Sequence, residues 1–284
     1  MYCVSFSITK LKSDLDVTGA KTTLNIPHIW SIDSAKNYTI KAKGDKQACV
    51  IYGCCMLPTG EILLADWNNR RLKKLNDRYQ VISVRDLPGF PCDVCYWGNN
   101  TAVLAMVNKM QFVDVRGGMS LTRRVKISQD CRGLACHGDQ LYVVGGSSVY
   151  KYSTSSLPSL LYTDHSGRVS FRHIAVSNYG NYIYITDTTS QIHIIDNEGN
   201  HLYTCTDPEL HGAWGVCVDG EDHVLTCNRV SKKVLQISSG SFQKLGIIAD
   251  RTNVSNAEVL CFNRSNATLV TAGVSDEIVV LKLK

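Results

Sequence analysis

The sequence predicts an all-β protein, a six-bladed β-propeller of four-stranded antiparallel blades closed by an N-terminal strand. Three observations support this prediction. A short motif recurs six times at steps of 40, 40, 40, 42 and 43 residues, each repeat contains strand-like apolar runs, and the last repeat lacks its final run. A period of this size is typical of stacked or radially arranged repeats. The motifs begin at Gly53, Asp93, Gly133, His173, Gly215 and Glu258.

The repetition is clearest between two segments of the same length. GCCMLPTGEILLADWNNRRLKKL begins at Gly53 and GVCVDGEDHVLTCNRVSKKVLQI begins at Gly215, and the two align without a gap. The alignment places Asp66 opposite Asn228 and Leu75 opposite Ile237. Residues of the same kind therefore recur at the same place in the repeat, as expected for duplicated structural units.

Each repeat has the residue pattern of short strands joined by turns. Runs rich in Val, Ile, Leu and Tyr alternate with clusters of Gly, Asn, Asp and Ser, which favour hairpin turns. After the motif, the second runs are residues 62–65, 102–106, 141–144, 182–186, 223–227 and 268–272. The third runs are residues 71–75, 110–115, 148–152, 192–196, 233–237 and 277–283, and a weaker fourth run follows in all but the last repeat.

The two ends of the chain account for the missing strand. The last repeat stops after its third run, from Glu277 to Leu283, while a strand-like segment from Asn37 to Lys43 precedes the first motif. Pairing of these segments would remove two open sheet edges at once. We therefore expect residues 33–284 to form the propeller and residues 1–32 to form an N-terminal extension.

Composition narrows the possible partners and the compartment. The 284 residues are 44% hydrophobic, which is enough for a core, but no apolar run approaches the length of about 18 residues that a membrane helix needs. The first residues lack the basic and apolar regions of a secretory signal. A net charge of +5 is small for a chain of this length. We expect a cytoplasmic protein with no membrane partner and no DNA partner.

Seven of the twelve cysteines occupy positions at which other repeats carry small hydrophobic residues: Cys54, Cys55, Cys95, Cys136, Cys217, Cys227 and Cys261. Reduced cysteine often takes such buried positions. We therefore expect no disulfide, and buried thiols at Cys55, Cys95 and Cys217. Cys92 and Cys95 have CxxC spacing, but no second pair stands at the distance typical of zinc sites. Metal or redox chemistry is the alternative interpretation, and no cofactor is assigned.

The segments GCCMLPTGEILLADWNNRRLKKL and IAVSNYGNYIYITDTTSQIHIID resemble NHL-type repeats. The run KNYTIKAKGD followed by GCCMLPTG most resembles the C-terminal six-bladed propellers of tripartite-motif proteins. This resemblance implies the substrate- or partner-recognition part of a ubiquitin ligase system. The zinc-binding spacings of RING and B-box domains and the heptads of a coiled coil are absent from the sequence. We therefore expect a non-catalytic interaction module and not an enzyme.

Loops on one face of the predicted ring carry basic and aromatic residues. Arginine beside aromatic residues is typical of protein interaction hot spots and of single-stranded RNA platforms. A protein or peptide partner is the preferred interpretation, and RNA is the alternative. The candidate partner-binding residues are Trp67, Arg70, Arg71, Lys109, Arg132, Arg172, Trp214 and Lys232.

Acidic residues give two further hypotheses. Asp66 and Asp187 end strands before polar turns, where aspartate usually accepts backbone N–H bonds, so we expect a structural role. Asp93, His173 and Glu258 begin alternate repeats and should surround the central channel. Such donors suit a divalent cation, so a metal-dependent, lactonase-like hydrolase is an alternative function if the three side chains converge. No catalytic residue is assigned.

Overall fold

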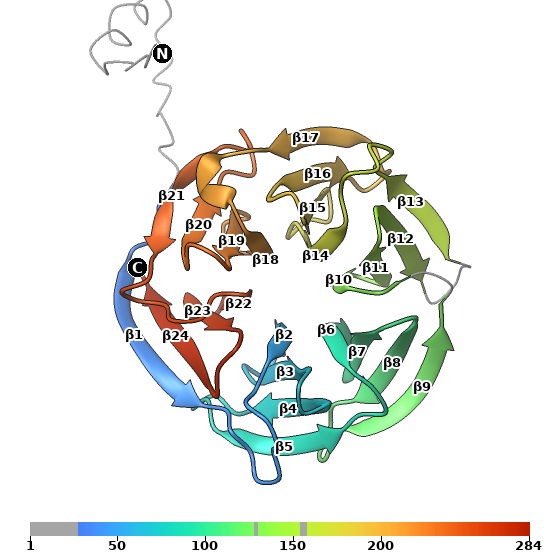
Figure 1. Cartoon of the computed structure of the whole chain (residues 1–284), viewed down its shortest axis with the longest axis vertical. Helices are drawn as coiled ribbons and strands as arrows, with labels where there is room; N and C mark the ends of the chain where they lie inside the picture. The colour runs from blue at the N-terminus through green and yellow to red at the C-terminus, as the bar shows by residue number, and fades with distance from the viewer. Residues whose placement is uncertain (1–27, 128–129, 154–157) are drawn as a thin grey trace, which may run out of the picture.

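The computed structural model describes residues 28–127, 130–153 and 158–284. Six four-stranded antiparallel sheets are arranged around a central channel, and the innermost strand of each sheet faces that channel (Figure 1). The predicted fold class is confirmed. Among the described residues the one helical segment is a 3₁₀ turn, η2 (Pro208–Leu210). No helix in these ranges is long and apolar enough to cross a membrane.

The first three blades each comprise four consecutive strands, named here from the channel outward. Blade 1 contains β2 (Ile51–Met56), β3 (Ile62–Asp66), β4 (Arg71–Leu75) and β5 (Val81–Asp86). Blade 2 contains β6 (Pro91–Gly98), β7 (Thr101–Met106), β8 (Lys109–Asp114) and β9 (Ser120–Lys126). Blade 3 contains β10 (Gly133–His137), β11 (Gln140–Gly145), β12 (Ser148–Ser153) and β13 (Ser159–Thr163).

The next two blades repeat this order, and the sixth takes its outer strand from the start of the chain. Blade 4 contains β14 (Phe171–Val176), β15 (Tyr182–Asp187), β16 (Ile192–Asp196) and β17 (His201–Cys205). Blade 5 contains β18 (Ala213–Val218), β19 (Val224–Asn228), β20 (Val234–Ile237) and β21 (Lys244–Ala249). Blade 6 contains β22 (Val259–Asn263), β23 (Thr268–Ala272), β24 (Glu277–Leu283) and β1 (Ile32–Thr39).

The core lies between neighbouring blades. Successive residues of a strand point to opposite faces of its sheet, and each face of a blade packs against a different neighbour. Leu63 of β3 belongs to the same cluster as Leu104 of blade 2, whereas Leu64 belongs to the same cluster as Val280 of blade 6. Both faces are buried, which explains why the middle strands are continuous apolar runs and do not alternate with polar residues.

Strand β1 closes the ring by pairing antiparallel with β24, with Asn37 opposite Val279 and Thr39 opposite Glu277 (Figure 1). The predicted pairing of the two chain ends is confirmed, but the strand spans Ile32–Thr39 and not 37–43. It ends earlier because the chain beyond Ile40 turns toward blade 1, where the Ala42 amide donates to Asp45.

The residues just before β1 extend this closure to blade 5. Trp30 Nε1 donates to Asp219 Oδ2 at 2.7 Å, and the Trp30 amide donates to Gln236 Oε1 at 3.0 Å. The Trp30 ring packs against the cluster shared by blades 5 and 6. Residues 1–27 of the expected extension lie outside the described residues.

The cysteines that the structure describes are all free thiols. Cys95 is buried, as expected, whereas Cys55 and Cys217 are only half-buried. All three residues line the central channel, and Cys55 and Cys217 expose more of their surface to that space than Cys95 does.

Deletion of β1 tests the closure. Removing residues 1–39 should lower the melting temperature by about 10 °C or more, since each kcal/mol shifts the Tm of a domain of this size by about 2–4 °C. The comparison is a chain that lacks only residues 1–27, and scanning calorimetry of both proteins measures the difference. Equal melting temperatures would show that β1 does not hold the ring closed.

Candidate functional site

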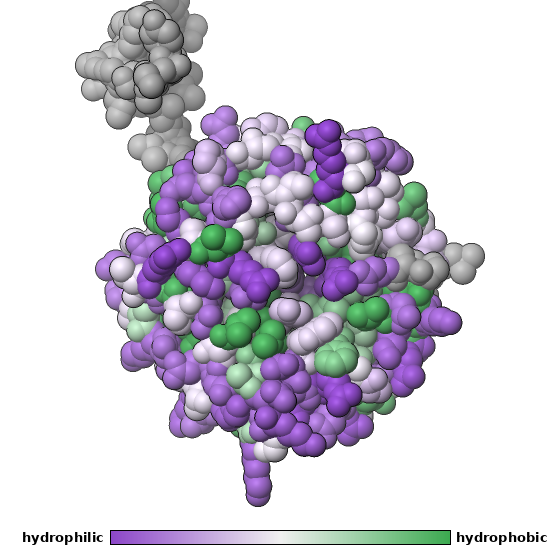
Figure 2. Space-filling view, in the orientation of Figure 1, coloured by the Kyte–Doolittle hydropathy of each residue, from purple (hydrophilic) through white to green (hydrophobic). Residues whose placement is uncertain are grey.

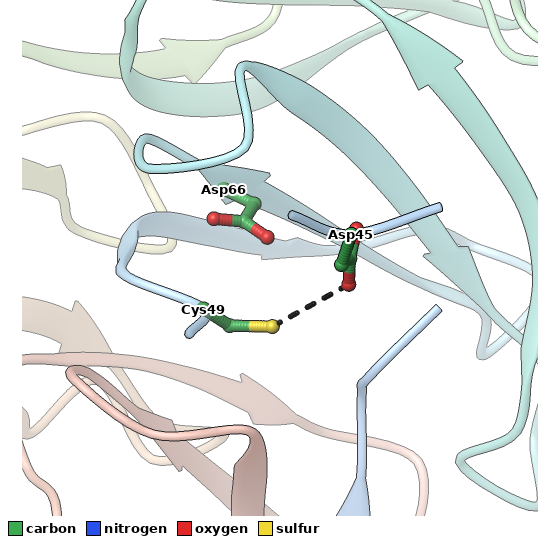
Figure 3. Close-up of side chains that lie close together, drawn as sticks. All are labelled: Asp45, Cys49 and Asp66. Atoms are coloured by element: carbon green, nitrogen blue, oxygen red, sulfur yellow. Dashed lines mark hydrogen bonds between the residues drawn. The ribbon is translucent and has the colours of Figure 1, made fainter. Parts of the chain in front are cut away.

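Asp45, Cys49 and Asp66 form the one group of three or more potential metal ligands found in the described ranges. Their side chains point toward a common centre (Figure 3). The Cys49 thiol donates to Asp45 Oδ2 at 3.7 Å. By ligand type alone, two carboxylates and a sulfur would suit a cation.

The centre of this group is taken by the ammonium group of Lys73. Lys73 Nζ lies 2.6 Å from Asp45 Oδ2, 2.9 Å from Asp66 Oδ2 and 3.1 Å from Cys49 Sγ. A fourth bond, to the Ile40 carbonyl at 3.0 Å, leaves this fully buried side chain with oxygen and sulfur partners only. The lysine supplies the positive charge that a metal would bring, so the group is a structural ion cluster.

The cluster fixes the chain between β1 and β2 to blade 1. Burial by itself would raise the pKa of Asp45, but bonds from Lys73, the Ala42 amide and Arg71 outweigh burial and lower that pKa. Burial likewise opposes the charge on Lys73, yet bonds to Asp45, Asp66 and Cys49 raise its pKa. Asp66 also accepts the Asn69 amide, as expected of a turn aspartate. The sequence by itself did not reveal that Asp66 also binds Lys73.

The anchor residues at the channel alternate between glycine and larger side chains for a steric reason. A Cβ atom on Gly53 would lie 2.5 Å from the Cα of Asp93, and one on Gly133 would lie 2.7 Å from the Arg172 carbonyl oxygen. Each glycine anchor therefore abuts the first strand of the next blade. This packing accounts for glycine at every second anchor and leaves Asp93, His173 and Glu258 as the anchors with side chains.

The three polar anchors do not converge on one point. His173 Nδ1 lies 3.8 Å from Asp93 Oδ2, whereas Glu258 Oε1 lies 3.2 Å from Arg229 Nε. Asp93 accepts the Leu134 and Val94 amides, both at 2.8 Å. Asp93 and His173 thus form a pair, and Glu258 faces a guanidinium group instead.

Burial controls the charge of this pair. It raises the pKa of Asp93 to about 8, against the opposing effect of the Leu134 and Val94 amides. Burial, together with the nearby charge of Arg172, lowers the pKa of His173 to about 4. At neutral pH both side chains are predominantly uncharged.

The basic and aromatic residues gather at the mouth of the channel. Four of them occupy the same place in their repeats, directly before the anchor of blades 1, 3, 4 and 5. These residues are Tyr52, Arg132, Arg172 and Trp214. Figure 2 shows one face of the ring, where hydrophobic side chains near the centre are interspersed with hydrophilic ones.

Trp214 lies between two guanidinium groups. Arg172 Cζ is 4.8 Å and Arg229 Cζ is 5.0 Å from the centre of its ring. Burial lowers the pKa of Arg172, and the charges of Arg132 and Arg229 lower it further. Arg172 Nε and Trp214 Nε1 are buried without a hydrogen-bond acceptor. Two donors that lack partners therefore lie within one group of positive charges.

A second aromatic group lies on the same face between blades 1 and 2. The Trp67 ring is 5.2 Å from the Tyr52 ring and 4.7 Å from the Phe90 ring. Arg70 Cζ lies 5.5 Å from the centre of the Phe90 ring. Phe90 is 44% exposed. Tyr52 precedes the anchor of blade 1 as Arg132 and Arg172 precede those of blades 3 and 4, so the two groups lie at the same end of the channel. We call these residues the mouth surface: Tyr52, Trp67, Arg70, Phe90, Arg132, Arg172, Trp214 and Arg229.

Some candidate residues lie apart from this surface. Arg71 is bound to Asp45 at 2.9 Å and to Asp86 at 2.8 Å, and only 16% of its side chain is exposed. In the parts of the chain that the structure describes, Lys109 and Lys232 form no ion pair or ring contact with the mouth surface. Lys109 is the first residue of β8, and Lys232 lies in the connection between β19 and β20, close to the start of β20.

Sequence reasoning missed Tyr52 and Phe90. Tyr52 could have been found from its place directly before the anchor, which it shares with Arg132, Arg172 and Trp214. Phe90 has no equivalent repeat position. Its role follows from the path of the β5–β6 connection, which brings it onto Trp67.

Replacing Lys73 by Met tests the ion cluster. The variant would leave Asp45 and Asp66 buried without their cation, so we expect a loss of about 3–5 kcal/mol in the free energy of unfolding. Urea unfolding measures the loss. Lys36, on the exposed outer strand, provides the matched control, and Lys36→Met should change stability by no more than about 0.5 kcal/mol. Equal effects of the two substitutions would contradict a structural role for Lys73.

The buried carboxyl of Asp93 predicts how stability depends on pH. Its folded pKa of about 8 lies above its ordinary value of 3.8, so its contribution to stability is present at low pH and decreases as pH rises toward 8. Above pH 6.5, its ordinary pKa, His173 is uncharged in both the folded and the unfolded protein. The change in stability between pH 6.5 and 8 is therefore attributed to Asp93. The free energy of unfolding of the wild type should decrease by up to about 2 kcal/mol between pH 6.5 and pH 8. Asp93→Asn should reduce this slope in pH-dependent urea unfolding, and an unchanged slope would refute the assignment.

Comparison with known proteins supports the fold and the resemblance. No family model matches the chain. It is 27% identical over 216 residues to the E3 ubiquitin-protein ligase TRIM56 of Mus musculus, a match that covers 72% of this chain. The matched part spans 29% of that ligase. The predicted resemblance to a tripartite-motif protein is confirmed, whereas the assignment of the repeats to the NHL type stays a prediction.

Solved structures with the same fold include bacterial lyases. Virginiamycin B lyase from Staphylococcus aureus superposes with a TM-score of 0.66 at 11% identity, covering 88% of this chain and 99% of the lyase. A catalytically inactive variant of that lyase with quinupristin gives a TM-score of 0.67 at 11% identity, covering 88% of this chain and 100% of the other. At this level of identity the similarity concerns the fold. The chain is an all-β propeller similar in sequence to part of a tripartite-motif ubiquitin ligase.

Proposed function

We propose that this propeller is a non-catalytic recognition module that binds a protein or peptide partner through the mouth surface. In this proposal it supplies partner or substrate recognition to a ubiquitin ligase system of the tripartite-motif kind. The similarity to TRIM56 supports that setting. The observation that carries the proposal is the position of Trp214 between Arg172 and Arg229.

Tryptophan and arginine are enriched among the few residues that contribute most of the binding energy of a protein interface, which cluster in well-packed pockets near its centre. Arg172 already has a buried Nε atom, and the stacking on Trp214 limits the entropy that its side chain can lose on binding. The acceptors that Arg172 Nε and Trp214 Nε1 lack can come from a partner's carboxylate or backbone carbonyl groups.

The distribution of charge favours a protein over RNA. Arg132 Nε is bound to Asp130 at 2.6 Å, and Arg229 is bound to Glu258. A nucleic-acid backbone approaching this surface would meet acidic groups beside two of its three central arginines. A protein partner can match alternating charges, whereas a polyanion cannot. RNA binding remains the alternative that the experiment below distinguishes.

The polar anchors support a non-catalytic role. A metal-dependent hydrolase would need Asp93, His173 and Glu258 to share one cation. The three side chains do not meet, because Asp93 and His173 face each other whereas Glu258 is bound to Arg229. The similarity to the lyases, at about a tenth of residues identical, is a similarity of fold and carries no residue role to this chain.

Quantitative affinity capture from cell extract tests the proposal, with and without nuclease treatment. Trp214→Ala and Arg172→Glu should each weaken retention of a partner that survives nuclease by about 30-fold or more, the loss typical of a hot spot worth about 2 kcal/mol. Trp97→Ala and Arg78→Glu are the matched controls, because both residues lie at the opposite face of the ring, at the end of β6 and in the β4–β5 turn.

The controls should retain the partner, and thermal unfolding should show that all four variants are folded. A ligand that disappears with nuclease, with an affinity that falls steeply with salt at a log–log slope of about 0.7 per phosphate, would establish RNA instead. Partners retained equally by all four variants would place the binding surface elsewhere.

A further inference from the structure

The three central arginines of the mouth surface differ in their ionic partners. Arg132 Nε lies 2.6 Å from Asp130 Oδ2, and Arg229 Nε lies 3.2 Å from Glu258 Oε1. Arg172 directly precedes the anchor of blade 4, between the blades that carry the other two arginines. Its side chain forms no ion pair with any residue that the structure describes, and its Nε atom is buried without an acceptor. Three guanidinium groups and two carboxylates leave one uncompensated positive charge, at Arg172.

The contacts of Arg172 hold this charge at the mouth of the channel. Its Cζ atom lies 4.8 Å from the centre of the Trp214 ring, and the Trp214 carbonyl accepts a bond from Thr186 Oγ1 of blade 4 at 2.6 Å. The half-buried guanidinium group is therefore stacked on a ring whose backbone is itself anchored. Burial, and next the charge of Arg132, lower the pKa of Arg172, so its charge is costly in the free protein. A hydrogen-bonded anion would offset that cost.

We propose that the partner places the side-chain carboxylate of one acidic residue on Arg172, an inference that rests on the proposed function of the mouth surface. The planar guanidinium group matches the two oxygens of a carboxylate. One carboxylate supplies the single negative charge that balances the three arginines. A phosphoryl group carries a charge of about −1.5 to −2 at neutral pH, and a nucleic acid carries one at every phosphate. Either would add an excess of negative charge beside Asp130 and Glu258.

The second aromatic group of the mouth surface indicates what surrounds this acidic residue in the partner. Tyr52 and Trp67 belong to blade 1 and Phe90 precedes blade 2, whereas Arg172 and Trp214 lie at blades 4 and 5. Phe90 is 44% exposed, so it offers an apolar surface to an apolar side chain of the partner. A peptide that contacts both groups crosses the opening of the channel. The acidic residue therefore lies within the peptide, with an apolar residue to one side of it, and is not a C-terminal carboxylate.

Selection from a peptide library by the full chain tests the inference. The probe is a phage-displayed library of random segments between fixed flanking residues, so every carboxylate in a random segment is a side chain. The retained peptides should be enriched in Asp or Glu at one position. A synthetic peptide of the selected sequence should bind about tenfold or more tightly than its Asn or Gln counterpart in titration calorimetry, the difference typical of a hydrogen bond to a charged group. Amidation of its C-terminus should leave the affinity unchanged.

Variants of the propeller assign this preference to one residue. Arg172→Gln should abolish the difference between the acidic peptide and its amide counterpart, and Arg172→Lys should restore part of it. Arg172→Glu should select peptides with Lys or Arg at the same position. Arg78→Gln is the matched control, because Arg78 lies in the β4–β5 turn at the opposite face of the ring. This variant should discriminate between the two peptides as the wild type does.

The outcomes separate this inference from the proposed function. Peptides whose retention is lost in Trp214→Ala, but which share no acidic position, would overturn the carboxylate inference and leave the mouth surface as a peptide site. If no retained peptide depends on Trp214, the proposed function and this inference both fail. Tighter binding when phosphoserine replaces the acidic residue would assign Arg172 to a phosphoryl group instead. A preference for the acidic peptide that persists in Arg172→Gln would also overturn the assignment.

Discussion

Closure of the ring is the constraint on which the rest of the structure depends. Each blade buries both of its faces, one against each neighbour, so no blade has a complete core unless the ring is complete. The pairing of β1 with β24 provides that completion. It joins two segments separated by most of the chain. Without it, the outer edge of β24 and the facing edge of β1 would both be unpaired. The bonds from Trp30 to Asp219 and Gln236 extend the same closure onto blade 5.

The buried ions act in support of this closure. Lys73 on β4 connects Asp45 and the Ile40 carbonyl, which follow β1, to Asp66 at the end of β3. A buried charge is costly unless its partners surround it, so the cluster fixes the path of the chain where it enters blade 1. Three potential metal ligands that face one another can therefore have a purely structural role when a lysine supplies the charge.

The channel and its mouth have different chemical characters. The wall contains thiols, the polar anchors Asp93 and His173 are uncharged by burial, and the mouth carries arginines stacked with aromatic rings. This separation arises from the repeat itself. The position before each anchor lies at the mouth, and the positions after it follow the channel wall.

The sequence by itself determined the class of fold, the number of blades and the pairing of the chain ends, because the spacing of turns and apolar runs is a local property that repeats. It also placed Arg132, Arg172 and Trp214 on one face, since they share a phase of the repeat. Only the tertiary structure decided that Lys73 fills the Asp45–Asp66 cluster, that Glu258 faces Arg229 and that Cys95 meets Cys136. These contacts join different strands, and mostly different blades, so they depend on distances across the ring that no repeat spacing specifies.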